Sequence, residues 1–158
     1  KRAINKETIL KLPSFIDATV ATIEMMTNSE ASKEKVEVNR LTIEDKKDKI
    51  ASSIGYYGAI DGMVVLVFPT EIARQTCELL IGESNGDTEM LLDTLAELVN
   101  IVGGKIKTLL SDMSINVNIT LPRTYDNVDS LLEVIGERKG VQVNLRFNEQ
   151  EFLFFLTR

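Results

Sequence analysis

One long amphipathic segment constrains this chain more than any other feature. Between about Met90 and Leu110, large apolar residues recur at spacings of three and four. On a helical wheel at about 100° per residue they gather on one side. They are Leu91, Leu92, Leu95, Leu98, Val99, Val102, Ile106, Leu109 and Leu110. The segment is therefore predicted to be the longest helix, with one face in a core that the rest of the chain must complete.

The opposite side of this predicted helix carries polar residues in line. Asp93, Glu97, Asn100 and Gly104, called the polar stripe below, follow at steps of four, three and four. The line continues through Lys107, Thr108 and Ser111. A solvated helix face is the ordinary explanation of such a pattern.

Three residues in or beside the stripe argue for more than a solvated surface. Gly103 and Gly104 lie in mid-helix, where each glycine costs about 1 kcal/mol relative to alanine. Asn100 is also a weak helix former, and it has no capping role there. We expect Gly104 to permit close approach of another molecule, and Gly103, nearer the core boundary, to serve packing within the protein.

The remaining segments predict an α+β protein with a mainly antiparallel sheet and long helices packed on it. Predicted helices cover 15–26, capped by Ser14, and 71–81, capped by Thr70 and closed by Gly82. Asp61-Gly62 suits the tight turn of a hairpin. Predicted strands cover 35–44 with a bulge near 39–40, then 50–60, 62–68, 115–121, 131–135, 141–147 and 152–156, with turns at 138–140 and 148–150.

No linker-like stretch divides the chain, so residues 1–158 are expected to form a single domain. Residues 1–14 are interpreted as a flexible or tag-adjacent N-terminal segment.

Composition excludes several classes of function. The chain has no histidine, which removes histidine-dependent triads, HExxH zinc sites and phosphorelay donors. Its one cysteine, Cys77, allows no intrachain disulfide or cysteine zinc cluster and is interpreted as part of the core. The formal net charge of −6 argues against nucleic acid as the main partner. Without a signal-peptide pattern or an apolar run near 18 residues, we expect a cytoplasmic protein with no membrane partner and no metal site.

The polar stripe lies within a pattern that resembles a known family. The segment Asp93-T-L-A-Glu97-L-V-Asn100-I-V-G-Gly104 resembles the D-x-x-x-E-x-x-N-x-x-x-G motif of the CheX/CheC/FliY chemotaxis phosphatases. The segments 15–20, 54–66 and 69–82 are similar to the family's opening helix, glycine-punctuated hairpin and second helix. The first helix offers only Glu24-Met-Met-Thr27, which lacks the asparagine. The chain is therefore more similar to CheX-like members, which have one site.

The resemblance implies a CheC/CheX-like fold and an enzyme: a phosphatase that accelerates hydrolysis of the aspartyl phosphate of a CheY-like response regulator. Asn100 would orient the attacking water, and Glu97 would pair with the regulator's lysine. Gly104 would allow close approach, and Asp93 would support polar contacts at the rim. The resemblance also implies no cofactor beyond Mg²⁺ supplied by the regulator, and a homodimer, for which the apolar C-terminal strands offer edges.

Two alternatives remain open at this point. The same fold could be a catalytically silent module that binds a receiver domain or a flagellar-switch-like partner. It could also be a structural dimerisation domain of a larger chain, which the absence of an initial methionine permits. The intact Glu97/Asn100 pair favours the enzyme over both.

Overall fold

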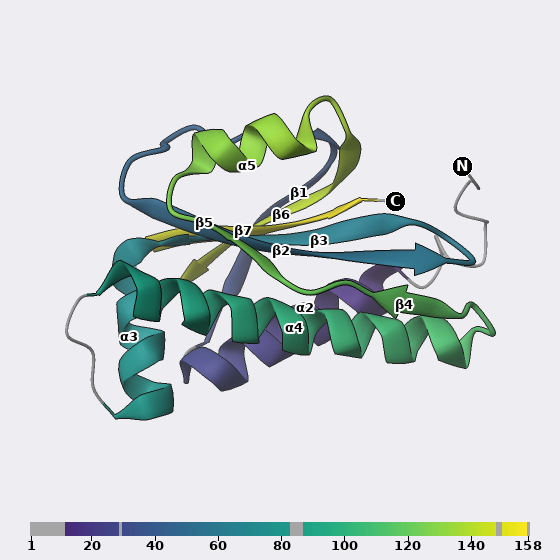
Figure 1. The fold of residues 1–158 in the computed structure, drawn as a ribbon, viewed down its shortest axis with the longest axis horizontal. Helices are drawn as coiled ribbons and strands as arrows, with labels where there is room; N and C mark the ends of the chain where they lie inside the picture. The colour runs from purple at the N-terminus through teal and green to yellow at the C-terminus, as the bar shows by residue number, and fades with distance from the viewer. Residues whose placement is uncertain (1–11, 29, 83–86, 148–149, 158) are drawn as a thin grey trace.

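The computed structural model describes residues 12–28, 30–82, 87–147 and 150–157. In this part of the chain, one seven-stranded sheet separates a layer of three helices from a single short helix (Figure 1). Every strand pairing is antiparallel. The α+β class predicted from the sequence is confirmed.

The helices divide between the two faces of the sheet (Figure 1). On one face lie α2 (Leu12–Thr27), α3 (Thr70–Ile81) and α4 (Thr88–Asp112), and on the other lies α5 (Val128–Ile135). No helix in the described part of the chain is long and apolar enough to span a bilayer.

The strands run in the spatial order β1-β6-β7-β3-β2-β4, and β5 also pairs with β2. Their bounds are β1 (Ser32–Arg40), β2 (Lys49–Gly58), β3 (Gly62–Pro69), β4 (Val117–Ile119), β5 (Arg123–Tyr125), β6 (Lys139–Phe147) and β7 (Gln150–Thr157).

Strand β3 lies at the centre of the protein because its apolar run faces two cores. Val64, Leu66 and Phe68 pack with α2, α3 and α4. Val65 and Val67 point the other way and pack with α5. A continuous apolar run is typical of a strand covered on both faces. The hairpin predicted from Asp61-Gly62 joins β2 to β3 as expected.

Both predicted N-terminal helix caps are wrong, by three residues in α2 and by one in α3, whereas Gly82 closes α3 as predicted. Helix α2 begins at Leu12, so Ser14 lies in its first turn. Pro13 is tolerated there because the first N–H groups of a helix have no intrahelical partner. Helix α3 begins at Thr70 with Pro69 in the cap position and no side-chain cap bond. The Thr70 N–H instead donates to the carbonyl oxygen of Asp48 at 2.8 Å.

The strand predicted at 131–135 is wrong, because these residues belong to helix α5. Val128, Leu131 and Ile135 are buried at spacings of three and four, which is a helical period. The Asn127 side chain caps the helix by accepting from the Ser130 N–H at 2.9 Å.

The first strand is also displaced from its prediction. It ends at Arg40, and its register shift lies between Lys33 and Lys35 rather than near 39–40. The chain leaves the sheet after Arg40 because Leu41 and Ile43 pack into the core beneath α5. The strand predicted at 115–121 is shorter, covering Val117–Ile119. Of the turn predicted at 148–150, residues 148 and 149 lie outside the described part.

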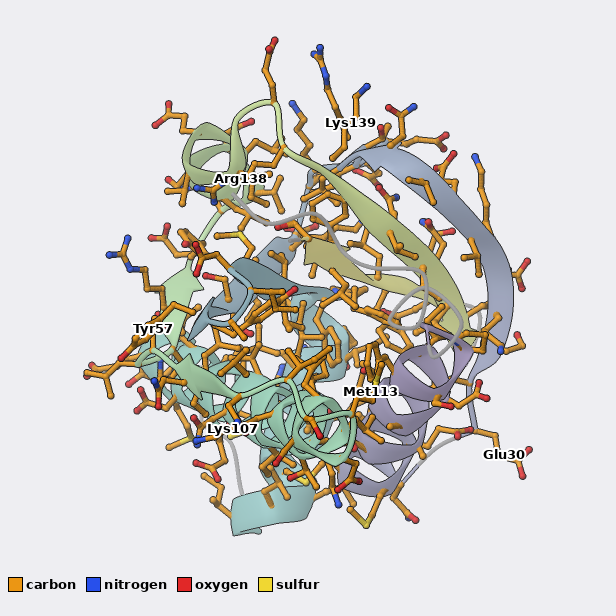
Figure 2. The ribbon with its side chains drawn as sticks, turned by 90° about the vertical axis from the view of Figure 1, so that its right-hand side faces the viewer. Glu30, Tyr57, Lys107, Met113, Arg138 and Lys139 are labelled. Carbon is orange, nitrogen blue, oxygen red and sulfur yellow. The ribbon has the colours of Figure 1, made fainter. Side chains whose placement is uncertain are left out.

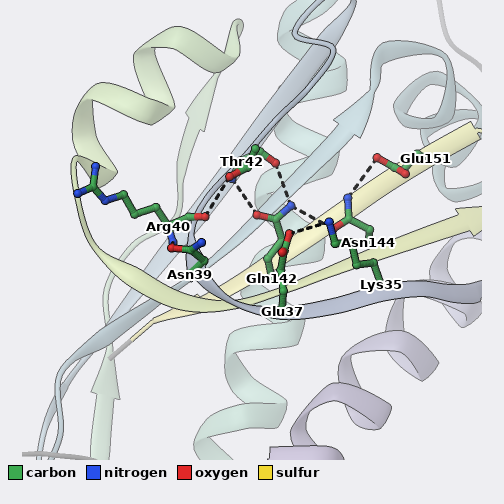
Figure 3. A network of polar contacts seen from close by, with 8 residues as sticks. All are labelled: Lys35, Glu37, Asn39, Arg40, Thr42, Gln142, Asn144 and Glu151. Atoms are coloured by element: carbon green, nitrogen blue, oxygen red, sulfur yellow. Dashed lines mark hydrogen bonds and ion pairs between the residues drawn. The ribbon is translucent and has the colours of Figure 1, made fainter.

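A buried amide fixes the chain where it leaves β1 (Figure 3). Gln142 of β6 is 2% exposed. Its side chain accepts from the Thr42 N–H at 2.8 Å and donates to the Thr42 carbonyl at 2.9 Å and to Asn144 at 3.0 Å. These bonds satisfy the buried amide and hold the segment after β1 against β6.

Candidate active site

Helix α4 presents the polar stripe on the side turned away from the sheet. Its buried face carries Leu91, Thr94, Leu95, Leu98, Val99, Val102, Gly103, Ile106 and Leu110. Asp93, Glu97 and Asn100 are exposed, and Gly104 is half-buried. The structure therefore brings all four predicted site residues together on one accessible ridge.

The ridge is long, and the N-terminus of its helix is capped. Helix α4 has 25 residues, which corresponds to a length of about 37 Å at 1.5 Å per residue. The Asp87 side chain caps it by accepting from the Glu89 N–H at 2.9 Å. Because the apolar side of α4 anchors it to β2 and to its neighbouring helices, the ridge has a fixed orientation.

Glu97 and Asn100 are available for an outside partner. Residues three apart on a helix have Cβ atoms about 5–6 Å apart, so one molecule can contact both. Among the described residues, neither side chain forms a hydrogen bond or an ion pair. Both groups therefore keep their full hydrogen-bonding capacity for a bound molecule.

The two adjacent glycines face different surroundings. A Cβ added at Gly103 would lie 2.9 Å from the Ile54 Cγ2 atom of β2. A Cβ added at Gly104 would meet nothing within 4 Å. Gly103 thus lets α4 lie close to the sheet, as the sequence indicates, whereas packing within the described residues does not explain Gly104.

Helix α2 does not present a comparable pair. The Glu24 carboxylate accepts from the Ala31 N–H at 2.9 Å. Thr27 is 5% exposed, and its hydroxyl donates to the Ile23 carbonyl at 2.7 Å. Both side chains serve the local structure, so the described chain carries the stripe on α4 without a counterpart on α2.

Two lysines accompany the stripe. Lys105 and Lys107 are both exposed on α4, and Lys107 points outward from the helix (Figure 2). Within the described ranges, no group of three or more His, Cys, Asp or Glu side chains is arranged to hold a metal ion.

Sequence reasoning missed a hollow beside the stripe, lined in part by Leu80 and Ile81 of α3. A signal for it exists in the sequence. Three successive helical residues span about 200° of the helix surface, so the apolar run Leu79-Leu80-Ile81 cannot turn wholly toward one core. All three side chains are indeed exposed.

Comparison with known proteins agrees with this architecture. The family described as "Chemotaxis phosphatase CheX" matches residues 50–146, a range that includes the whole polar stripe. A curated protein named CheY-P phosphatase CheX, from Thermotoga maritima, is 27% identical over 105 residues, which is 65% of this chain and 67% of that protein.

Solved structures show the same fold. The CheX–CheY–BeF₃–Mg²⁺ complex from Borrelia burgdorferi matches with a TM-score of 0.71 and 18% identity, covering 92% of this chain and 96% of that chain. The chemotaxis protein CheX from Desulfovibrio desulfuricans matches with a TM-score of 0.68 and 17% identity, covering 91% and 95%. With the family match extending over more than half of its residues, this chain belongs to the CheX chemotaxis phosphatase family.

Proposed function

We propose that this chain is a phosphatase that accelerates hydrolysis of the aspartyl phosphate on a CheY-like response regulator. The observation that carries the proposal is the pair Glu97 and Asn100, which are exposed one turn apart on α4 and have no partner among the described residues. The names of two relatives support it: one is called a CheY-P phosphatase, and the other was solved as a complex with CheY.

The chemistry requires little from this protein beyond positioning. The water oxygen bonds to phosphorus as the bond from phosphorus to the aspartyl oxygen breaks. The regulator regains its carboxylate, and both water protons leave with the phosphate. An acyl phosphate is already labile, so placing the water in line is the main contribution needed. The Mg²⁺ and the lysine around the phosphoryl group would belong to the regulator.

Asn100 is the group proposed to place the water. A carboxamide both donates and accepts hydrogen bonds, and it does not titrate near neutral pH. It can therefore hold a water in one orientation, as the water-orienting glutamine of GTPases does. An effect of about a hundredfold on the rate corresponds to about 2.7 kcal/mol of barrier.

Glu97 is proposed to fix the register of the complex by pairing with the regulator's lysine. A charge-assisted hydrogen bond in an interface closed to water is stronger than one in solvent. Gly104, with open space where a Cβ would be, would let the regulator's backbone approach α4. Asp93 would support polar contacts at the rim.

The assay that tests this function follows the decay of phosphorylated receiver domains. A panel of CheY-like receivers is phosphorylated with acetyl phosphate and Mg²⁺, and decay is measured with and without the protein. We expect a shortened phosphate lifetime for at least one receiver, and no shortening by the Glu97→Ala/Asn100→Ala double variant. Binding without accelerated decay would instead identify a silent receiver-binding module.

We also propose a homodimer, through a different strand from the one the sequence favours. The C-terminal strands do not offer edges, because β6 lies between β1 and β7, and β7 lies between β6 and β3. Strand β1 lies at one edge of the sheet, and its Val36 and Val38 are exposed. In light scattering at micromolar concentration, the wild-type protein should have twice the monomer mass, and Val38→Lys should have the monomer mass. A monomeric wild type would contradict the proposal.

A cytoplasmic location stays a prediction.

A further inference from the structure

A hollow of about 650 Å³ lies where α2, α3 and the start of α4 meet. It is lined by Met26, Leu80, Ile81, Asp87, Glu89, Met90, Asp93, Thr94 and Glu97. Three helices therefore build one concave surface from segments distant in the sequence.

The lining combines apolar side chains with negative charge. Met26, Leu80, Ile81 and Met90 supply the apolar surface, and Leu80 and Ile81 are 42% and 55% exposed. The carboxylates, all exposed, are those of Asp87, Glu89, Asp93 and Glu97. Among the residues that the structure describes, the lining contains no lysine or arginine. Such a surface is complementary to an apolar group surrounded by positive charge.

The hollow is continuous with the polar stripe. Asp93 and Glu97 belong to both, and Asn100 lies one turn beyond Glu97. Met90 precedes Asn100 by ten residues, which is about 15 Å along a helix. A standard protein interface covers about 800 Å² on each partner, so one bound domain can reach the hollow and Asn100 together.

We infer that the hollow binds an apolar side chain flanked by lysine or arginine, carried by the same receiver domain whose phosphoryl group reaches Asn100. This inference rests on the proposed function, because it assigns the receiver domain as the occupant. It makes Leu80 and Ile81 determinants of which regulator is bound, separate from the residues that act on the phosphate.

The test measures binding and hydrolysis separately for Leu80→Lys. The probe is the tightest-binding member of a panel of CheY-like receiver domains, held active by beryllofluoride and Mg²⁺. The new charge would meet the basic flank of the partner and leave its apolar group without an apolar contact. We expect the dissociation constant to rise tenfold or more, while the hydrolysis rate at saturating phosphorylated receiver stays within about twofold of wild type.

Val134→Lys is the matched control. Val134 has nearly the same exposure, 43%, and lies on α5 across the sheet. It should leave the dissociation constant unchanged, and Leu80→Met should keep wild-type binding.

The outcomes separate this inference from the proposed function. Weakened binding by Leu80→Lys supports the inference even if the wild type shows no hydrolysis. The absence of hydrolysis would reject the phosphatase proposal alone. Unchanged binding by Leu80→Lys overturns the inference even if hydrolysis is fast. Three other results also overturn the inference. Val134→Lys could weaken receiver binding as much as Leu80→Lys does, Leu80→Lys could change the oligomeric mass without weakening binding, or the wild type could bind no receiver.

Discussion

At the scale of single residues, the two adjacent glycines of α4 show how neighbouring positions serve different ends. Gly103 lies against Ile54 of β2, which leaves no room for a methyl group. Gly104 faces open space. Both glycines weaken the helix intrinsically by about 1 kcal/mol, but only Gly103 offsets this by packing within the described protein.

This contrast gives a prediction for two alanine variants. Gly104→Ala should raise the free energy of unfolding by about 0.5–1 kcal/mol, because helix propensity improves without a clash. It should also slow the proposed dephosphorylation, because the methyl group would occupy the side proposed to face the regulator. Gly103→Ala should lower stability, because overpacking costs about 1–3 kcal/mol against that gain.

Urea denaturation and the phosphate decay assay check both variants. Each glycine variant serves as the control for the other. A Gly104→Ala protein that is both more stable and fully active would show that Gly104 has no part in binding.

At the scale of secondary-structure elements, the long segments with a clear period could be predicted and the short ones could not. Helix α4 and the β2–β3 hairpin repeat their pattern over many residues, so one exception changes little. Helix α5 spans only eight residues. Its apolar positions Leu131 and Ile135 fit either a strand or a helix unless Val128 and the cap are considered together.

The cap of α5 yields the next prediction. Asn127→Ala removes the acceptor for the Ser130 N–H, so it should lower the free energy of unfolding by about 1 kcal/mol. Asn118→Ala, at an exposed position of β4, is the control and should change stability by less than about 0.5 kcal/mol. Equal effects in urea denaturation would show that the cap is not what α5 depends on.

At the scale of the whole molecule, one buried phenol joins distant parts of the chain. Tyr56, near the end of β2, donates a hydrogen bond to the carbonyl oxygen of Thr157, near the end of β7. Burial raises the pKa of Tyr56 above its ordinary value. The folded protein therefore holds this proton more tightly than the unfolded chain does.

The raised pKa predicts a loss of stability in alkali. The contribution is fully present below the unfolded pKa of about 10 and is lost as the pH rises above it. The slope from Tyr56 approaches 1.36 kcal/mol per pH unit. Between about pH 8 and 11, the free energy of unfolding should fall less steeply with rising pH for Tyr56→Phe than for wild type, although the value for Tyr56→Phe at pH 8 should be lower. Equal slopes would show that Tyr56 is not the cause of the loss of stability.

More of the candidate site than of its surroundings could be predicted from the sequence. The spacing of Asp93, Glu97 and Asn100 on one helix is local, so the sequence alone places them on one face. The hollow beside them is not local, because Met26, Leu80 and Met90 come together only when three helices pack. The sheet edge depends in the same way on strand order, which is why β1 rather than the C-terminal strands is left unpaired on one side.

The most direct test of the central claim separates binding from hydrolysis in Asn100→Ala, with Asn118→Ala as the control. The hydrolysis rate at saturating phosphorylated receiver should fall about a hundredfold. The dissociation constant for the beryllofluoride-activated receiver should change less than about threefold, and Glu97→Ala should weaken that binding as well. Full hydrolysis by Asn100→Ala would contradict the assignment of the water to this residue.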